Sequence, residues 1–223
     1  MKIIFLYNEI IIKYKNEKEK DKINNIFENS LNNCTINKFK NDYNINKDNN
    51  TNISLIKKKN LIKIEYEVSK WDNKIKIFGD IFVNNNKNKC FIVNKGIKYN
   101  LSEYFTIKNK KKSKLKIELA GIKNVFNLES MFYSCSSLIS IKDIYNWNIN
   151  KVTNISKLFY NCLDLKSIPD ISYWKTNNVT DMNHLFCNCM GLKSIPDISI
   201  WNTDKLIDMS FLFFNCLNLY LIF

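Results

Sequence analysis

The residues best suited to chemistry in this sequence are seven cysteines, one histidine and a set of regularly spaced aspartates. His184, Cys187 and Cys189 lie close together in the chain, and thiolate and imidazole groups are common ligands of zinc. Cys189, however, belongs to a set of cysteines that recurs every 27 residues, and no second cluster completes four ligands. We therefore expect reduced, buried, structural thiols and no metal site.

Nucleophilic catalysis needs a base beside the nucleophile, and His184 is the only histidine. Asp143, Asp170 and Asp197 also recur every 27 residues, which indicates acceptors for backbone N–H groups in repeated turns. A catalytic pair of carboxylates would break this symmetry. The four glycines form no phosphate-binding loop. We expect no catalytic residue, no enzyme activity and no cofactor.

The elements that carry these residues are internal repeats. The phrase LKSIPDIS occupies residues 165–172 and returns at residues 192–199. Three sets of residues keep the same 27-residue step: Phe132, Phe159, Phe186 and Phe213; Cys135, Cys162, Cys189 and Cys216; and Trp147, Trp174 and Trp201. A fixed period of this size indicates repeated units that stack on one another and share a core.

The hydrophobic pattern changes within each repeat. In VTDMNHLFCNC the apolar residues have helical spacing, which predicts a short helix with Thr180 as its N-cap and Asn188 at its C-terminal cap. LKSIPDI predicts a short strand, in which Pro196 prevents a helix. The segment that follows predicts a turn around the buried Trp201. We expect the strands of successive repeats to pair in parallel.

The stretch VTDMNHLFCNCMGLKSIPDISIWNTDK resembles a BspA-like leucine-rich repeat, in which a V-T-D-M-x-x-L-F-x-x-C helix precedes L-x-x-I-x-D-I-S-x-W. Four such units fill residues 124–223; the first lacks the proline, and the fourth stops before its aspartate and tryptophan. The resemblance implies an α+β fold, a leucine-rich-repeat solenoid with a short parallel strand plus a short helix per coil, capped by an N-terminal β-rich region. Repeats of this kind are typical of protist and bacterial surface proteins.

We expect three regions along the chain. Residues 121–223 hold about four repeats, the last one truncated. Residues 61–120 form a β-rich capping region, with strands at LIKIEYEV, KIKIFGDIFV and KLKIELAGI and a hairpin that bends at residues 94–96. Residues 1–60 are poorly defined, with a ββα or β-grasp-like start and an Asn-rich linker.

The charge is concentrated in the first half of the chain. Residues 1–120 carry 26 lysines and 13 acidic residues, whereas residues 121–223 carry 8 of each. The lysine-rich, arginine-free composition is typical of an AT-rich genome, and specific nucleic-acid sites usually employ arginine. We expect no specific nucleic-acid partner. RNA or membrane-surface binding through the lysines of residues 1–120 is an alternative.

The N-terminal apolar run is interrupted by Asn8 and Glu9, and no stretch reaches the length of a transmembrane helix. We therefore predict a cytoplasmic protein without a transmembrane segment, with a cell-surface location as the alternative.

The predicted function is that of a non-enzymatic protein–protein interaction module using a leucine-rich-repeat surface, whose protein partner is unknown. A cell-surface adhesin-like protein that binds matrix or host components is the alternative, and a solvated face without a ligand is a third reading. The uncapped C-terminal end suggests end-to-end self-association. The candidate binding face consists of Lys166, Ser167, Asp170, Lys193, Ser194 and Asp197.

Overall fold

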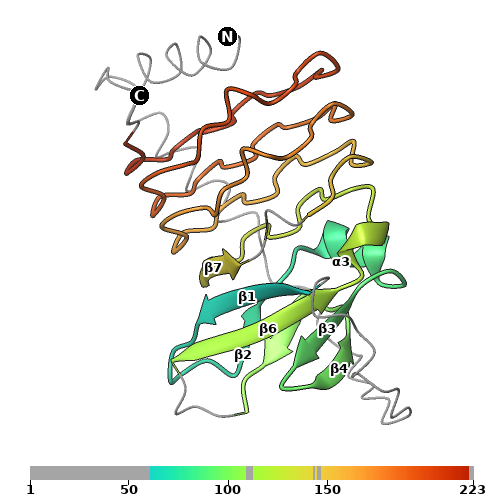
Figure 1. The fold of residues 1–223 in the computed structure, drawn as a ribbon. Coiled ribbons are helices and arrows are strands. Elements are labelled where there is room, and N and C mark those ends of the chain that lie inside the picture. The colour runs from blue at the N-terminus through green and yellow to red at the C-terminus, as the bar shows by residue number, and fades with distance from the viewer. Residues whose placement is uncertain (1–60, 109–112, 143, 145–146, 221–223) are drawn as a thin grey trace. The chain divides into compact units, whose positions relative to one another are not determined.

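The computed structural model describes residues 61–108, 113–142, 144 and 147–220. Regular secondary structure in this part of the chain is mostly antiparallel β-sheet (Figure 1). The larger sheet has the strand order β4-β3-β6-β1-β7, with β1 at Ile62–Glu67, β3 at Phe91–Asn94, β4 at Ile97–Asn100, β6 at Lys114–Ala120 and β7 at Leu138–Lys142. The smaller sheet pairs β2 (Lys74–Lys76) with β5 (Tyr104–Thr106). The predictions for residues 1–60 lie outside the described residues.

Strand β1 confirms the prediction from the alternating pattern of LIKIEYEV. Ile62, Ile64 and Tyr66 are buried, whereas the residues between them point away from the core. This alternation arises because successive side chains of a strand point to opposite faces. On the outer face, the Glu65 carboxylate lies 3.4 Å from the Lys116 ammonium. The strand predicted at KLKIELAGI is also confirmed, since it forms β6 beside β1.

The predicted hairpin is confirmed as β3 and β4, which are joined by Lys95 and Gly96. Both loop residues have positive φ, as a two-residue turn of the type that matches strand twist requires. The long strand expected at KIKIFGDIFV is wrong. It consists of the short strand β2, followed by helix α3 (Asp80–Asn86) with Asp80 in the first turn, where a negative charge favours a helix.

The segment LISIK of the first repeat forms β7, which pairs antiparallel with β1. The equivalent segments of the second and third repeats form only one isolated bridge, between Ser167 and Ser194. The first repeat has Lys142 where the later repeats have Pro169 and Pro196. Proline has no N–H to donate and interrupts a hydrogen-bonded ladder. The missing proline therefore allows the first repeat to join the sheet.

The predicted leucine-rich-repeat solenoid, with a helix and a parallel strand in each coil, is wrong. In the segment expected to be helical, Lys157 N–H donates to the Asn183 carbonyl (2.9 Å) and Phe159 N–H donates to that of Leu185 (2.9 Å). An α-helix would direct these groups to carbonyls four residues earlier in the same segment. Lys157 also has a φ of 55°, which no right-handed helix accepts. The segment is a run of turns bonded to the next repeat.

The predicted helix caps have other roles for the same reason. Thr180 donates its hydroxyl to the Thr153 carbonyl of the preceding repeat (3.1 Å). Asn188 has a φ of 60° and accepts a hydrogen bond on its side-chain oxygen from the Asn215 amide (3.0 Å). Within the described part of residues 121–223, the only helical element is the 3-10 turn η4 at Ile122–Asn124.

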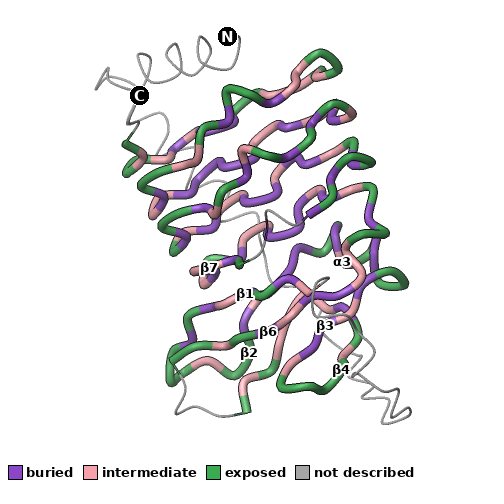
Figure 2. The backbone as a smooth tube through the Cα atoms, in the orientation of Figure 1, coloured by how far each residue is buried: buried purple, intermediate pink, exposed green. Residues whose placement is uncertain are grey.

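Aromatic rings form two columns through the repeats, and both were expected from the 27-residue step. The Phe159 and Phe186 rings are stacked with centroids 5.6 Å apart, and those of Trp174 and Trp201 are stacked at 6.0 Å. The Trp201 indole N–H donates to the Ile171 carbonyl of the preceding repeat (3.0 Å). Figure 2 shows buried backbone along each repeat between exposed bends.

The sheet region meets the repeats through two neighbouring residues. Phe78 is fully buried and places its ring 5.8 Å from that of Phe132, at the start of the phenylalanine column. Gly79 donates its N–H to the Met131 carbonyl (2.9 Å). A Cβ on Gly79 would lie 2.0 Å from the Ser130 carbonyl oxygen, so only glycine fits at this contact.

Candidate functional site

The six residues of the predicted binding face lie on two successive repeats and are all exposed. We call this set the repeat face: Lys166, Ser167, Asp170, Lys193, Ser194 and Asp197. Its two halves are in register, because Ser167 bridges Ser194 in parallel and Lys193 N–H donates to the Lys166 carbonyl (2.9 Å). The backbone hydrogen bonds therefore hold equivalent side chains of the two repeats as neighbours.

The two aspartates of the repeat face accept hydrogen bonds in tight turns, as predicted. Asp170 Oδ1 accepts from the Ser172 hydroxyl (2.6 Å) and from its backbone N–H (2.9 Å). Asp197 Oδ1 accepts from the Ser199 N–H (2.8 Å). The hydroxyl and N–H of Ser172 hold the pKa of Asp170 below 3.8, and Ser199 lowers the pKa of Asp197 in the same way. Asp143 lies outside the described residues.

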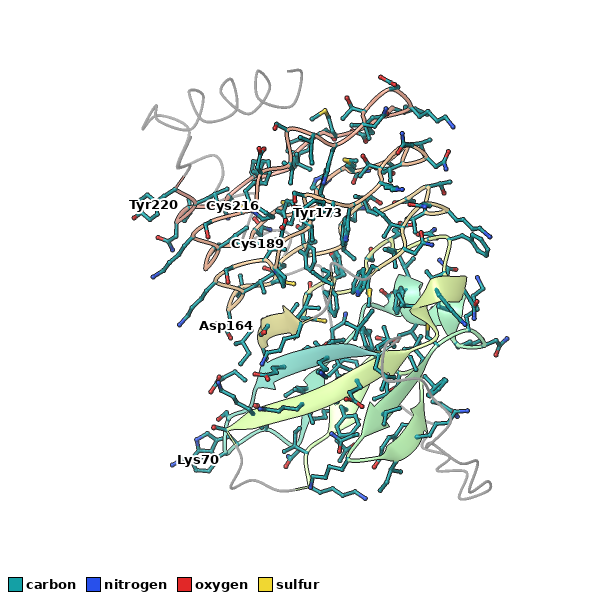
Figure 3. All side chains as sticks on the ribbon, in the orientation of Figure 1. Lys70, Asp164, Tyr173, Cys189, Cys216 and Tyr220 are labelled. Atoms are coloured by element: carbon teal, nitrogen blue, oxygen red, sulfur yellow. The ribbon has the colours of Figure 1, made fainter. Side chains whose placement is uncertain are left out.

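Two exposed apolar side chains lie beside these turns and were not predicted. Tyr173 is 75% exposed and Ile200 is 66% exposed, and they occupy equivalent positions of successive repeats. Each directly precedes a buried tryptophan of the stacked column, so the two side chains project from neighbouring turns (Tyr173 is labelled in Figure 3). We call Tyr173 and Ile200 the apolar pair. An apolar residue in an otherwise polar turn was the sequence signal for it.

Tyr220 extends the repeat face into the fourth repeat. Its N–H donates to the Lys193 carbonyl (2.9 Å), so it follows Lys166 and Lys193 in the same set of positions. Its side chain is 70% exposed, and Figure 3 shows it projecting from the edge of the last repeat. The surface thus combines ammonium, carboxylate, hydroxyl and aromatic groups, a mixture that suits contact with another protein.

The cysteines of the repeats are structural. Cys162 and Cys189 are fully buried, and the Cys189 thiol donates to the Phe159 carbonyl of the preceding repeat (3.0 Å). Burial raises the pKa of both thiols well above 9.0, so they are poor nucleophiles at neutral pH. Successive cysteines of this set lie in successive repeats, as the labelled Cys189 and Cys216 show in Figure 3.

The cluster of His184, Cys187 and Cys189 does not come together as a set of ligands. His184 stacks on Phe211 with ring centroids 4.8 Å apart, and burial lowers its pKa below 6.5. Cys187 was expected to point outward, but it is only 2% exposed, and burial raises its pKa to about 12. Within the described ranges, no group of three or more histidine, cysteine or acidic side chains is arranged to hold a metal ion.

One protein family matches this chain over residues 98–220, from the start of β4 to the end of the described repeats. The match covers more than half of the 223 residues. The chain belongs to the DUF285 family. That family is described as a Mycoplasma protein of unknown function. The assignment to BspA-like leucine-rich repeats is therefore wrong, as the family match and the turn-based repeats both indicate.

The DUF285 match includes the repeat face, the apolar pair and strand β6, so the candidate surface lies within the family region. No curated protein and no solved structure matches the chain. None of the helices in the described residues is long and apolar enough to span a lipid bilayer.

Proposed function

We propose that this DUF285 chain is a non-enzymatic protein-interaction module that binds a protein partner through the repeat face and the apolar pair. One observation carries the proposal: Tyr173 and Ile200 are exposed at equivalent positions of neighbouring repeats, next to the turns of Asp170 and Asp197. Exposed aromatic and aliphatic side chains surrounded by polar groups are typical of protein interfaces.

The backbone beneath this surface favours binding because it is already ordered. The carboxylates of Asp170 and Asp197 fix the turns that carry the apolar pair, and the stacked Trp174 and Trp201 hold these turns from below. A surface ordered before binding loses less conformational entropy when a partner arrives. The charges support a partner of mixed character, since Lys166 and Lys193 alternate with the two carboxylates.

The experiment is affinity capture by the full chain from the native cells, with two matched variants. Tyr173→Ser combined with Ile200→Ser should lose the captured partner. Ile97→Ser, which changes a 58% exposed isoleucine of β4, should retain it. Equal capture by both variants would show that the partner binds elsewhere, and capture of nothing by the wild-type chain would favour a solvated face without a ligand.

The adhesin-like alternative rested on the resemblance to BspA-like repeats and loses that support with the assignment to DUF285. It remains testable by labelling the surface of intact cells. Detection of the intact protein at the surface would contradict the proposed cytoplasmic location.

End-to-end self-association through the fourth repeat stays a prediction. Ile207 is 87% exposed and Leu217 is 68% exposed in this repeat. Sedimentation equilibrium of the full chain tests it, because Ile207→Asp and Leu217→Asp should each weaken a self-association made through these side chains. A monomer at all concentrations would contradict it.

A further inference from the structure

Trp71 is unlike the other three tryptophans of the chain. It is 77% exposed at the turn between β1 and β2, whereas Trp147, Trp174 and Trp201 are 4–5% exposed in the core of the repeats. Exposing an indole to water is unfavourable, so a tryptophan held outward indicates a surface that it contacts. We propose that the β1–β2 turn docks onto an anionic lipid surface, with the Trp71 indole at the level of the headgroups.

The turn that presents Trp71 is fixed by three hydrogen bonds. Ser69 N–H donates to Asp72 Oδ2 (2.7 Å), Asp72 N–H donates to the Ser69 carbonyl (3.1 Å), and Trp71 N–H donates to the Ser69 hydroxyl (3.3 Å). Both ends continue into paired strands, with Asn73 accepting on its carbonyl from Ile107 N–H (2.8 Å). The backbone therefore holds Trp71 at the tip of the turn.

Lysines surround this tip. Lys70 places its ammonium 4.9 Å from the centroid of the Trp71 ring, so a positive charge accompanies the indole (Lys70 is labelled in Figure 3). Lys74 begins β2, and Lys108 directly follows Ile107, which is bonded to the turn. The nearby acid within the turn is Asp72, whose carboxylate is engaged with Ser69. The tip therefore carries a positive charge excess.

This combination fits a lipid headgroup layer. Tryptophan prefers the boundary between water and hydrocarbon because its ring is apolar and its N–H is polar. Lysines beside it are attracted to anionic headgroups, and these two contributions add in peripheral membrane binding.

A nucleic acid fits the same tip less well. One face of the Trp71 ring is already occupied by the Lys70 ammonium, which hinders the stacking of a base. Nucleic-acid sites favour arginine for its planar, bidentate contacts, and the chain has none. The turn also projects and forms no groove in which a strand would lie.

The test uses the full chain with vesicles of phosphatidylcholine alone and vesicles that also contain phosphatidylserine. Because Trp71 is the exposed tryptophan, its fluorescence should shift to the blue and become protected from a soluble quencher when phosphatidylserine is present. Trp71→Phe should lose this shift while the three buried indoles still emit. Trp71→Ala should weaken cosedimentation with these vesicles about tenfold.

Two matched controls separate this proposal from a general effect of charge or surface hydrophobicity. Tyr173→Ala removes an aromatic of nearly equal exposure and should retain vesicle binding. Lys70→Glu with Lys108→Glu should abolish binding, whereas Lys166→Glu with Lys193→Glu makes the same change in net charge on the repeat face and should retain it.

Equal losses in the matched pairs would overturn the proposal, and so would the absence of a Trp71 shift with phosphatidylserine. A shift produced only by a single-stranded oligonucleotide would assign the tip to nucleic acid. None of these results depends on the repeat face, so this proposal and the proposed function fail separately.

Discussion

Phe78 and Phe132 hold their rings 5.8 Å apart, although 54 residues separate them in the chain. Phe78 comes just before helix α3, and Phe132 is the first ring of the column that Phe159 and Phe186 continue. The hydrophobic core of the repeats therefore begins on a residue of the sheet region.

Replacing Phe78 tests this connection. Phe78→Ala should lower the free energy of unfolding by about 3–5 kcal/mol, because it removes a fully buried ring and leaves a cavity against Phe82 and Phe132. Urea unfolding followed by circular dichroism measures the loss. Phe126→Ala, at a phenylalanine that is 49% exposed, is the matched control and should change stability far less. Equal losses in the two variants would contradict the buried contact.

A second pair of variants tests which residues of the repeat point inward. Ile168 is 7% exposed, whereas Lys166, two positions earlier, is exposed. Ile168→Asp should cost at least about 3 kcal/mol by burying an unpaired charge, and Lys166→Asp should cost little. Thermal unfolding measures both. Similar melting temperatures would sink the assignment of inward and outward positions.

The turns of the repeat face should make stability depend on acid pH. Hydrogen bonds from Ser172 and Ser199 lower the pKa of Asp170 and Asp197 in the folded chain, so the unfolded chain binds protons more readily. Their stabilising contribution is present above pH 3.8 and is lost as the pH falls through the lower folded pKa values.

Asp170→Asn combined with Asp197→Asn keeps an acceptor oxygen and removes the titration. The double variant should therefore lose less of its melting temperature than the wild-type chain when the pH is lowered below 3.8. Parallel curves for the two proteins would show that these carboxylates do not contribute.

The buried cysteines should resist alkylation in the folded chain. Cys162 and Cys189 have pKa values well above 9.0 because of their burial, and the thiolate is the reactive form. Mass spectrometry after brief treatment with iodoacetamide at neutral pH should find both thiols unmodified, and unfolding in urea should expose them. Rapid modification in the folded chain would rule out the structural role.

Part of the fold followed from side-chain pattern alone. Alternation over Ile62, Ile64 and Tyr66 predicted β1, and the 27-residue step predicted the stacked tryptophans. In both cases burial imposes a period that the sequence displays directly.

The conformation within each repeat could not be read in this way. The apolar spacing of Met182, Leu185 and Phe186 suits one face of a helix, but the same residues are buried in consecutive turns. Helix and turns are distinguished by positive φ at His184 and by hydrogen bonds to the next repeat. Histidine carries no signal for positive φ, and the bonds connect residues far apart in sequence.

The polar part of the candidate surface was predicted because exposed strand and turn positions of a repeat are conspicuous. Tyr173 and Ile200 were missed, since each directly precedes a tryptophan and was taken as part of a polar turn. Trp71 was missed for a similar reason: the sequence shows a turn at SKWDN but not that its indole faces solvent.

The central claim is that a protein partner contacts the apolar pair, and photo-crosslinking tests it most directly. A photoreactive amino acid is placed at Tyr173 in one sample and at the exposed Ile97 of β4 in another, and each full chain is irradiated in the native cells. We expect a discrete protein adduct from position 173 that excess unlabelled chain prevents, and no such adduct from position 97. No adduct at 173, or the same adduct from both positions, would contradict the account.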